Sequence, residues 1–435
     1  MPRPNILYLH SHDTGRYIQP YGHAIPTPNL QRLAEDGMLF RQAFTVAPTC
    51  SPSRACLLTG QSAHNSGMFG LAHRGFRLND YRQHLVHTLH AAGYASTLIG
   101  VQHVAKDAAE IGYGQVIAGS RAPQAAAHAQ AFFDSKPTEP FFLDIGTIET
   151  HRKFRPAGRA EDARYCLPPA HLPDTAETRA DMADFKASAR VLDQAYGSIL
   201  DSLDASGLAE NTLVICTTDH GIAFPRMKCN LTDAGTGILL IMRGPGGFTG
   251  GMACDAMVSH LDIFPTLCDL LEIARPPWLQ GESLLPLVNG GAEEIHEEIF
   301  TEVNYHAAFE PMRGARTRRW KYIRRYDGRT TPVLPNCDDG PSKSVWMAGS
   351  WRERPVEEEQ LYDLLFDPQE THNQANDPAA AGALAEMRGR LDRWMRATDD
   401  PLLTGTIPVP SGALVNDADG LSPSLFIPAA LPRPV

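Results

Sequence analysis

Short apolar runs that alternate with helical segments constrain the fold of this chain more than any other feature. The runs are rich in β-branched residues, as buried strands are, and they occupy 5–10, 95–100, 141–147, 212–218 and 237–242. Segments with helical patterns lie between them, at 27–37, 82–93 and 177–207. Strands that alternate with helices form a mainly parallel sheet covered on both faces. We therefore predict an α/β fold with a large, mainly parallel sheet sandwiched by helices.

The pattern changes after residue 273. Shorter strand-like segments with alternating charges follow, at 298–309, 311–328 and 358–368, and a helical segment spans 378–398. We expect a small C-terminal antiparallel sheet that this helix closes. The chain then divides into a catalytic domain at 1–290, a small subdomain at 291–400 and a tail at 401–435.

The tail is rich in proline, with seven among the last 35 residues. Proline cannot continue a helix, yet the tail is too apolar for a plain linker. We expect it to lie along its own subunit or along a neighbour, which makes a homo-oligomer plausible.

Composition excludes several classes of protein. The net charge of −11 argues against a broad basic surface for nucleic acid. A membrane span needs a run of about 18 apolar residues, and the sequence has none. The first residues enter a strand without a signal-peptide pattern, so we expect a cytoplasmic protein. The eight cysteines form no CxxC pair, which suits free thiols in a reducing compartment.

The segment "CSPSRACLLTG", which begins at Cys50, combines a thiol with helix-start residues. With Ser51 as N-cap and Pro52 as the first helical residue, Cys50 lies just ahead of the helix. Free N–H groups and the helix dipole favour an anion there, and Arg54 can lean back toward it. Spacing alone equally allows a helix-cap thiol with an incidental arginine.

This segment resembles the signature C-x-P-S-R of type I, formylglycine-dependent sulfatases, members of the alkaline phosphatase superfamily. Further blocks resemble that family: "PNILYLHSHD", "GVQHV", "NTLVICTTDHG" and "LYDLLFDPQE". The nearest branch contains bacterial arylsulfatases and N-sulfoglucosamine sulfohydrolase-like proteins. The resemblance implies an alkaline phosphatase-like fold. It also implies that a formylglycine-generating enzyme converts Cys50 to formylglycine.

Formylglycine supplies chemistry that a thiol lacks. An unperturbed thiol, with a pKa of about 8.5, is an ordinary nucleophile. In the family, the aldehyde is hydrated, one hydroxyl attacks sulfur, and the other is later deprotonated to expel sulfate. Two steps replace one difficult hydrolysis, as in other covalent catalysis.

The ends of two predicted strands carry candidate metal ligands. Asp13 follows the first strand, and Asp219 with His220 follows 212–218, so the three can meet at one edge of the sheet. The resemblance implies that they hold a divalent cation together with an oxygen of residue 50. His12 departs from the family's usual aspartate; it is either a further ligand or a histidine that fills a polar cleft. The resemblance implies Ca²⁺, and an imidazole ligand makes Mn²⁺ the alternative.

The resemblance also assigns roles to residues that handle protons and sulfate. His103 matches the histidine that deprotonates the sulfated diol. His151 and Lys228 match residues that hold a sulfate oxygen or protonate the leaving group. Val101 stands where the family usually has a lysine, so one positive charge is missing unless Lys106 or another residue replaces it.

Three further residues are candidates for the wall of a substrate pocket. They are His73, Tyr305 and His306, on segments expected near the same edge of the sheet. An aromatic residue and a histidine at a strand end more often serve packing than recognition.

The sequence thus predicts an enzyme of the arylsulfatase type that hydrolyses a small sulfate ester. One alternative is a phosphonate monoester or phosphodiester hydrolase of the same superfamily. A second alternative, motivated by His12 and Val101, is a non-catalytic member that binds anionic sugars.

Overall fold

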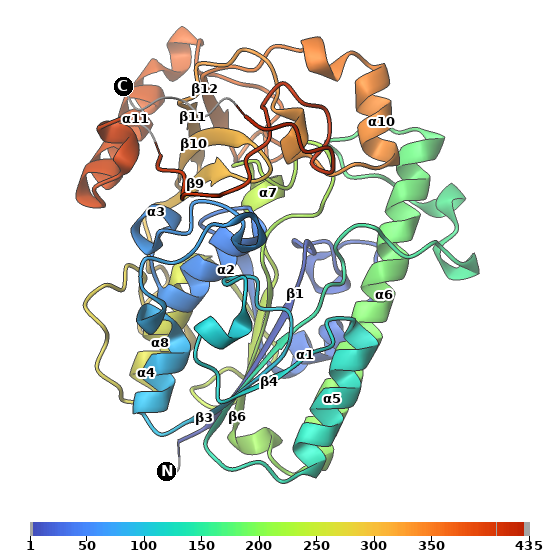
Figure 1. Ribbon diagram of the computed structural model, residues 1–435, viewed down its shortest axis with the longest axis vertical. Helices are drawn as coiled ribbons and strands as arrows, with labels where there is room; N and C mark the ends of the chain where they lie inside the picture. Colours follow the sequence, from blue (N-terminus) through green and yellow to red (C-terminus); the bar gives the residue numbers. More distant parts are fainter. Residues whose placement is uncertain (1–2, 406, 430–435) are drawn as a thin grey trace.

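A large mixed sheet forms the centre of the computed structural model, which describes residues 3–405 and 407–429 (Figure 1). Its strand order is β4-β3-β5-β1-β6-β7-β2-β8. In chain order the strands are β1 (Asn5–Ser11), β2 (Met38–Phe44), β3 (Ala95–Gly100), β4 (Gln115–Ile117), β5 (Phe141–Gly146), β6 (Thr212–Thr218), β7 (Leu240–Arg243) and β8 (Met252–Ser259).

Seven of these strands run in one direction. β1 pairs in parallel with β5 and β6, and β3 pairs in parallel with β4 and β5. Only β7 runs the other way, since it is antiparallel to both β6 and β2, whereas β2 and β8 are parallel. The carboxyl ends of β1, β2, β3, β5 and β6 therefore share one edge of the sheet.

Helices cover both faces of this sheet (Figure 1). Helices α1 (Pro28–Asp36), α5 (Ala122–Asp134) and α6 (Ala176–Ala205) bury apolar side chains against one face. Helices α2 (Cys50–Thr59), α4 (Leu85–Ala91) and α8 (Ile263–Leu270) cover the other. Burial on both faces explains why β1 and β6 read as continuous apolar runs rather than alternating ones.

A second sheet lies at one end of the molecule (Figure 1). It is antiparallel, in the order β12-β11-β10-β9. Its strands are β9 (Ile299–Tyr305), β10 (Phe309–Arg316), β11 (Trp320–Arg325) and β12 (Glu359–Asp363), and α11 (Ala381–Ala397) packs on one face. The remaining helices are short: α3 (Ala63–Ser66), α7 (Asp233–Thr236), α9 (Leu285–Val288) and α10 (Pro341–Ala348).

The described part of the tail lies along its own chain. The backbone N–H of Leu414 donates to the carbonyl of Arg74 at 2.8 Å, and that of Asn416 donates to the carbonyl of Ala307 at 2.8 Å. No helix in the described ranges, 3–405 and 407–429, is both long and apolar enough to span a membrane.

The predicted α/β fold with a small antiparallel sheet is confirmed. Three strands lie outside the predicted apolar runs. β2 is interrupted by the exposed Arg41, β4 has three residues, and the first half of β8 is largely exposed at the sheet edge. None of the three buries a continuous apolar run, so none gives the signal that marks the central strands.

Candidate functional site

The shared edge of the large sheet brings the predicted ligands together. β1 ends directly before His12 and Asp13, and β6 ends directly before Asp219 and His220. A loop of five residues after β2 leads to Cys50 at the start of α2. Strand ends that are far apart in sequence thus supply one buried cluster.

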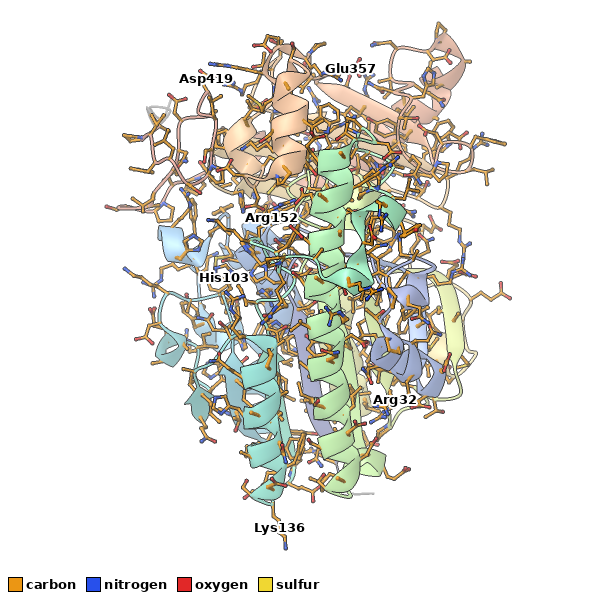
Figure 2. The ribbon with its side chains drawn as sticks, turned by 90° about the vertical axis from the view of Figure 1, so that its right-hand side faces the viewer. Arg32, His103, Lys136, Arg152, Glu357 and Asp419 are labelled. Carbon is orange, nitrogen blue, oxygen red and sulfur yellow. The ribbon has the colours of Figure 1, made fainter. Side chains whose placement is uncertain are left out.

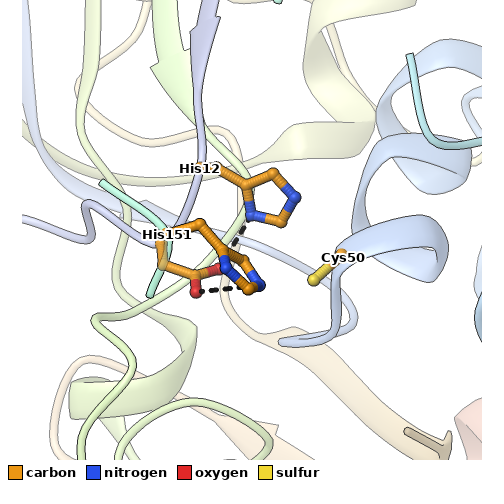
Figure 3. Close-up of side chains that lie close together, drawn as sticks. His12, Cys50 and His151 are labelled. Carbon is orange, nitrogen blue, oxygen red and sulfur yellow. Dashed lines mark hydrogen bonds and ion pairs between the residues drawn. The ribbon is translucent and has the colours of Figure 1, made fainter. Parts of the chain in front are cut away.

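The side chains of this cluster are close enough together for one metal ion to contact several of them. His12 Nδ1 is 2.9 Å from Asp13 Oδ1 and 3.0 Å from Asp219 Oδ2. Ligand atoms of Asp13, Cys50, Asp219 and His220 all lie within 4.8 Å of each other, as do those of His12, Asp13, Cys50 and His151. Figure 3 shows the rings of His12 and His151 on the side that faces the Cys50 sulfur.

The hydrogen bonds of His220 leave a lone pair inside the cluster that could bind a cation. Its Nδ1 faces the Gly221 carbonyl at 3.0 Å, and because a carbonyl only accepts, Nδ1 carries the proton of the neutral ring. The bare Nε2 then faces Asp13 Oδ1 at 3.4 Å and Asp219 Oδ2 at 3.7 Å, with no hydrogen-bond partner among the described residues. A lone pair that faces carboxylate oxygens in a buried space is the arrangement a divalent cation satisfies.

His12 is arranged differently: because carboxylates only accept, its Nδ1 carries the proton toward Asp13 and Asp219, and its bare Nε2 has no hydrogen-bond partner among the described residues. Burial lowers the pKa of its imidazole to about 4, although Asp219 and Asp13 act in the opposite direction. The ring is therefore neutral near pH 7, which is the form that binds metals. Two carboxylates and two imidazoles around residue 50 suit Mn²⁺, whereas a Ca²⁺ site usually offers oxygen alone.

The helix that carries Cys50 starts two residues earlier than predicted. Thr49 is the N-cap, with extended φ of −137° and ψ of 142°, and Cys50 is the first helical residue. The prediction of Ser51 as N-cap and Pro52 as first residue is wrong because the Ser51 hydroxyl is used elsewhere: it accepts from the backbone N–H of Ala72 at 3.0 Å. Cys50 still lies in the first turn, where free N–H groups favour an anion.

Cys50 itself is a poor nucleophile as a thiol. It is buried, and burial raises the pKa of the thiol well above its usual range. A thiol that stays protonated near pH 7 reacts slowly.

Arg54 lies behind the cluster rather than bonded to Cys50. Its guanidinium donates to Asp219 Oδ2 at 3.2 Å and to the Ser11 carbonyl at 3.0 Å, and it also bonds His10 Nδ1. Because Arg54 only donates, His10 Nδ1 accepts, and His10 Nε2 donates to Asp144 Oδ1 at 2.8 Å.

Tyr113 completes this chain by donating to Asp144 Oδ2. Sequence analysis did not select His10, Asp144 or Tyr113. A signal existed for two of them, since His10 and Asp144 are polar residues inside the apolar runs of β1 and β5.

Lys228 reaches the cluster from the loop after β6. Its Nζ lies 3.0 Å from Asp13 Oδ2 and 2.9 Å from Asp338 Oδ2. Burial lowers the pKa of the ammonium, but these two carboxylates outweigh it and raise the pKa well above its usual range. Lys228 is therefore a permanent positive charge. Asp338 was not selected from the sequence, because only the folded chain brings its loop here.

Three histidines surround the exposed side of the cluster. His73 Nδ1 lies 3.2 Å from His103 Nε2, and their rings are stacked 5.3 Å apart. The ring of His12 lies 5.5 Å from that of His103 and 4.7 Å from that of His151. Burial lowers the pKa of His103 well below its usual value, so its ring is neutral near pH 7.

Two site residues have unusual backbone conformations. Asp13 has φ of +55° and His103 has φ of +61°, both in the left-handed region. Such conformations cost about 1–3 kcal/mol each and cluster at functional sites. Figure 2 shows both His103 and Arg152 near the middle of the molecule. The Arg152 guanidinium donates to the two carboxylate oxygens of Asp181 at 2.8 and 2.7 Å, which anchors the His151 loop to α6.

The remaining predicted residues are placed differently from one another. His306 is buried near the cluster, and burial together with the charge of Lys228 lowers the pKa of its imidazole well below the usual value. Tyr305 is packed in the core against Phe76, with its hydroxyl donating to the Ile407 carbonyl at 3.1 Å. Lys106 is exposed, and the structure records no contact that brings it into the place of the missing lysine at Val101.

Comparison of the sequence with protein-family models and with known proteins finds sulfatases. A sequence model of the sulfatase family matches residues 4–273, and one for the C-terminal part of N-sulphoglucosamine sulphohydrolase matches residues 228–344. The human N-sulphoglucosamine sulphohydrolase (Homo sapiens) is 30% identical over 465 residues, covering 91% of each chain.

Solved structures share the fold. A protein bound to its substrate D-glucosamine-2-N,6-O-disulfate superposes with a TM-score of 0.72 at 18% identity, covering 92% of this chain and 98% of that chain. A phosphonate monoester hydrolase from Silicibacter pomeroyi superposes with a TM-score of 0.69 at 19% identity, covering 92% and 97%. At these identities the likeness establishes the fold alone.

Proposed function

This chain belongs to the sulfatase family, whose members hydrolyse sulfate groups, and on that premise we propose that it removes a sulfate group from a sugar. In this proposal residue 50 acts as formylglycine, and one divalent cation is bound beside it. The observation that carries the proposal is the buried cluster of Cys50 with Asp13, Asp219 and His220, in which unpaired lone pairs converge.

The metal would be held by Asp13, Asp219, His220 and His12, with residue 50 beside them. A bound divalent cation supplies positive charge that polarises sulfate oxygens and favours an oxygen nucleophile. The resemblance implies Ca²⁺, and the two imidazoles support Mn²⁺. Metal analysis of the purified protein decides between the two ions.

Residue 50 must be modified to act in this site. Hydrated formylglycine supplies an oxygen nucleophile where the buried thiol supplies none. A formylglycine-generating enzyme is thus a necessary partner during maturation, and the signature around Cys50 is its recognition sequence.

The neighbouring cationic and titratable residues have distinct roles in this proposal. Lys228, held charged between Asp13 and Asp338, binds a sulfate oxygen. His151, whose side chain is 28% exposed, lies where it can protonate the leaving oxygen or nitrogen. His103 is neutral and accepts the proton whose removal releases sulfate. Arg54 holds Asp219 in place through their contact at 3.2 Å.

A sugar is preferred to an aryl group as the carrier of the sulfate. The support is the match along 91% of the chain to N-sulphoglucosamine sulphohydrolase, together with the match to the C-terminal model of that protein. His73, on the exposed side of the cluster, and His306, near Lys228, are candidates for contacts to the sugar.

The test is expression together with a formylglycine-generating enzyme, followed by mass spectrometry of the Cys50 peptide and assay on a sulfated glucosamine. We expect the modified residue and sulfate release, and expect Cys50→Ala to abolish turnover. Cys56→Ala, six residues along the same helix and also buried, is the matched control and should stay active. An unmodified thiol with no turnover would favour a member that only binds anionic sugars.

The same assay separates sulfatase from phosphonate hydrolase. His12 and the uncharged Val101 alter the positive charge around the anion, which is the reason to keep the phosphonate alternative. Turnover of an aryl phosphonate far above that of any sulfate would contradict the proposal.

A further inference from the structure

The C-terminal tail is hydrogen-bonded to Arg74, the residue that follows His73. The backbone carbonyl of Arg74 accepts from the N–H of Leu414 at 2.8 Å. Its guanidinium donates to Asn416 Oδ1 at 2.9 Å and to the Pro423 carbonyl at 3.1 Å. Arg74 forms no ion pair among the residues that the structure describes, so its guanidinium is used to hold the tail.

Asn416 is the matching residue of the tail. It is buried, and its side chain bonds at both ends: Oδ1 accepts from Arg74, and Nδ2 donates to the Leu425 carbonyl at 3.2 Å. Its backbone N–H donates to the Ala307 carbonyl at 2.8 Å, in the loop after β9, and Figure 1 shows the red tail passing the second sheet near β9. Asn416 therefore joins the tail to the Arg74 loop and to the loop that carries His306.

The tail also lies directly against Gly75. This glycine has φ of +99°, in the left-handed region, and a Cβ at this position would lie 3.0 Å from the Ala413 Cα. A side chain here would displace the backbone of the tail. Ile407 and Val415 are buried in the same apolar core as the helices α2, α4 and α8. The contact between the tail and the Arg74 loop is thus closely packed.

These contacts hold the His73 loop from one side. On the other side of His73, the backbone N–H of Ala72 donates to the Ser51 hydroxyl at 3.0 Å, in the helix that begins at Cys50. The His73 side chain is itself exposed, so burial does not fix it. Its position therefore depends on two anchors of its loop, one on α2 and one on the tail.

His73 in turn bonds the ring of His103. His73 Nδ1 lies 3.2 Å from His103 Nε2, and the two ring planes are within 7° of parallel. The other ring nitrogen of His103, Nδ1, is buried and has no hydrogen-bond partner among the described residues. The bond to His73 therefore sets the rotation of a ring whose backbone φ of +61° is already strained.

We propose that the tail positions His103 through Arg74 and His73, which makes Arg74 and Asn416 positioning residues of the reaction centre. This inference rests on the proposed function, in which His103 accepts the proton whose removal releases sulfate. It adds that the reaction depends on Asn416, which lies 342 residues from Arg74 in the chain.

The kinetic test uses Arg74→Ala and Asn416→Ala in the full-length enzyme that contains formylglycine, with a sulfated glucosamine as substrate. The loss of one hydrogen bond corresponds to a change of about fivefold in rate, so we expect kcat per folded molecule to fall about fivefold in each variant. Arg74→Lys keeps one donor toward Asn416 and should lose less. Unchanged kcat in both alanine variants would overturn the inference.

Arg329→Ala is the matched control. Arg329 also holds the tail, by donating to Asp419 Oδ1 at 2.6 Å, but it does not bond the His73 loop. Its removal should leave kcat unchanged. A fall in kcat as large as that of Arg74→Ala would show that any loosening of the tail lowers activity, which contradicts the specific path through Arg74.

A His73→Ala background distinguishes positioning from a general loss of stability. Because Arg74 is proposed to act through His73, adding Arg74→Ala to His73→Ala should change kcat by less than about twofold. A further loss of about fivefold, as independent effects would give, would overturn the inference. So would full activity of His73→Ala alone.

Hydrogen exchange gives a readout that does not depend on turnover or on the modification of Cys50. In the full-length protein, Asn416→Ala should raise amide exchange in peptides that cover 72–78 and 305–309, whereas Arg329→Ala should not. Unchanged exchange at 72–78 in Asn416→Ala would overturn the inference whatever the activity. If the unsubstituted enzyme released no sulfate from any substrate, the proposed function would be contradicted, while the exchange measurement would still decide whether the tail holds the His73 loop.

Discussion

Two buried clusters of charged residues in this protein have opposite organisations. The metal cluster, made of His12, Asp13, Asp219 and His220, leaves lone pairs facing one another. The seam cluster, made of His64, Glu302, Arg313 and Asp400, joins α3 to the C-terminal sheet, and all four of its side chains are fully buried.

In the seam cluster donors meet acceptors. Arg313 donates to Asp400 at 2.5 and 3.0 Å and to the carbonyls of Met312 and Val303. His64 Nδ1 lies 2.9 Å from Glu302 Oε1. A network with matched partners fixes a structure, whereas unmatched acceptors require a ligand. The difference predicts that substitutions in the metal cluster affect activity and substitutions in the seam cluster affect stability.

The largest effect is expected from Asp13→Asn. Activity should fall at least about 1000-fold, equivalent to about 4 kcal/mol of transition-state stabilisation, because a ligand charge is lost. The free energy of unfolding of the metal-free protein should change by less than about 1 kcal/mol, since the asparagine oxygen can still accept from His12 Nδ1 and Lys228 keeps Asp338. Steady-state kinetics and urea unfolding test the two parts.

Asp193→Asn is the control for that experiment. Asp193 is equally buried but bonds Asn29 and Leu30 of α1, far from the metal cluster. It should retain full activity. A loss of stability in Asp13→Asn as large as its loss of activity would remove the distinction between the clusters.

Arg313→Met should have the opposite profile. The substitution leaves Glu302 and Asp400 without their cation, and breaking a buried ion pair costs about 3–5 kcal/mol of unfolding free energy. The folded fraction should keep its kcat, because none of these groups touches the metal cluster. Urea unfolding at pH 7 measures the first effect, and activity corrected for folded fraction measures the second. A changed kcat at full folding would contradict the assignment.

The seam cluster should also contribute to acid unfolding. Burial acts to raise the pKa of Glu302, but His64 and Arg313 outweigh it and lower the pKa to about 2. A lowered pKa stabilises the fold above the usual value of about 4.5, and that stability is lost as pH falls toward 2. Glu302→Gln should therefore be less stable at pH 7 but lose less stability between pH 4.5 and 2 than the unsubstituted protein.

Glu297→Gln provides the reference slope for that titration, because the Glu297 side chain is 90% exposed. Its stability should follow the unsubstituted protein at every pH. Equal slopes for Glu302→Gln and Glu297→Gln would show that Glu302 contributes no pH-dependent stability.

The sequence predicts a cluster when its residues lie at recognisable positions, such as the ends of predicted strands. Asp13, Asp219 and His220 directly follow strands whose carboxyl ends share an edge, so the strand pattern places them together. Asp338 lies more than 100 residues from Lys228, and His64 of the seam cluster lies 238 residues from Glu302, so these contacts form only in the folded chain. The direction of β7 was equally hidden, since a short apolar run reads the same in either direction.

Sequence patterns also could not separate packing from recognition. Tyr305 and His306 are adjacent at the end of β9, yet one packs on Phe76 and the other lies near Lys228. Successive residues of a strand point to opposite faces, but which face meets the reaction centre depends on how the second sheet docks. Only the tertiary structure supplies that information.

The smallest effect on activity is expected from the hydrogen-bonded residues that support the metal cluster from behind. Tyr113, Asp144 and His10 form a chain of hydrogen bonds that ends at Arg54, which in turn holds Asp219. Tyr113→Phe removes the donor to Asp144 but leaves every metal ligand in place. One hydrogen bond contributes about 1 kcal/mol, so kcat should fall about fivefold, with little change in KM. Tyr94→Phe removes a comparable buried hydroxyl, bonded to the Pro4 carbonyl at 2.7 Å, and should lower stability without lowering kcat. If both variants kept full kcat, the chain would only stabilise the fold, and the metal cluster would hold its geometry without it.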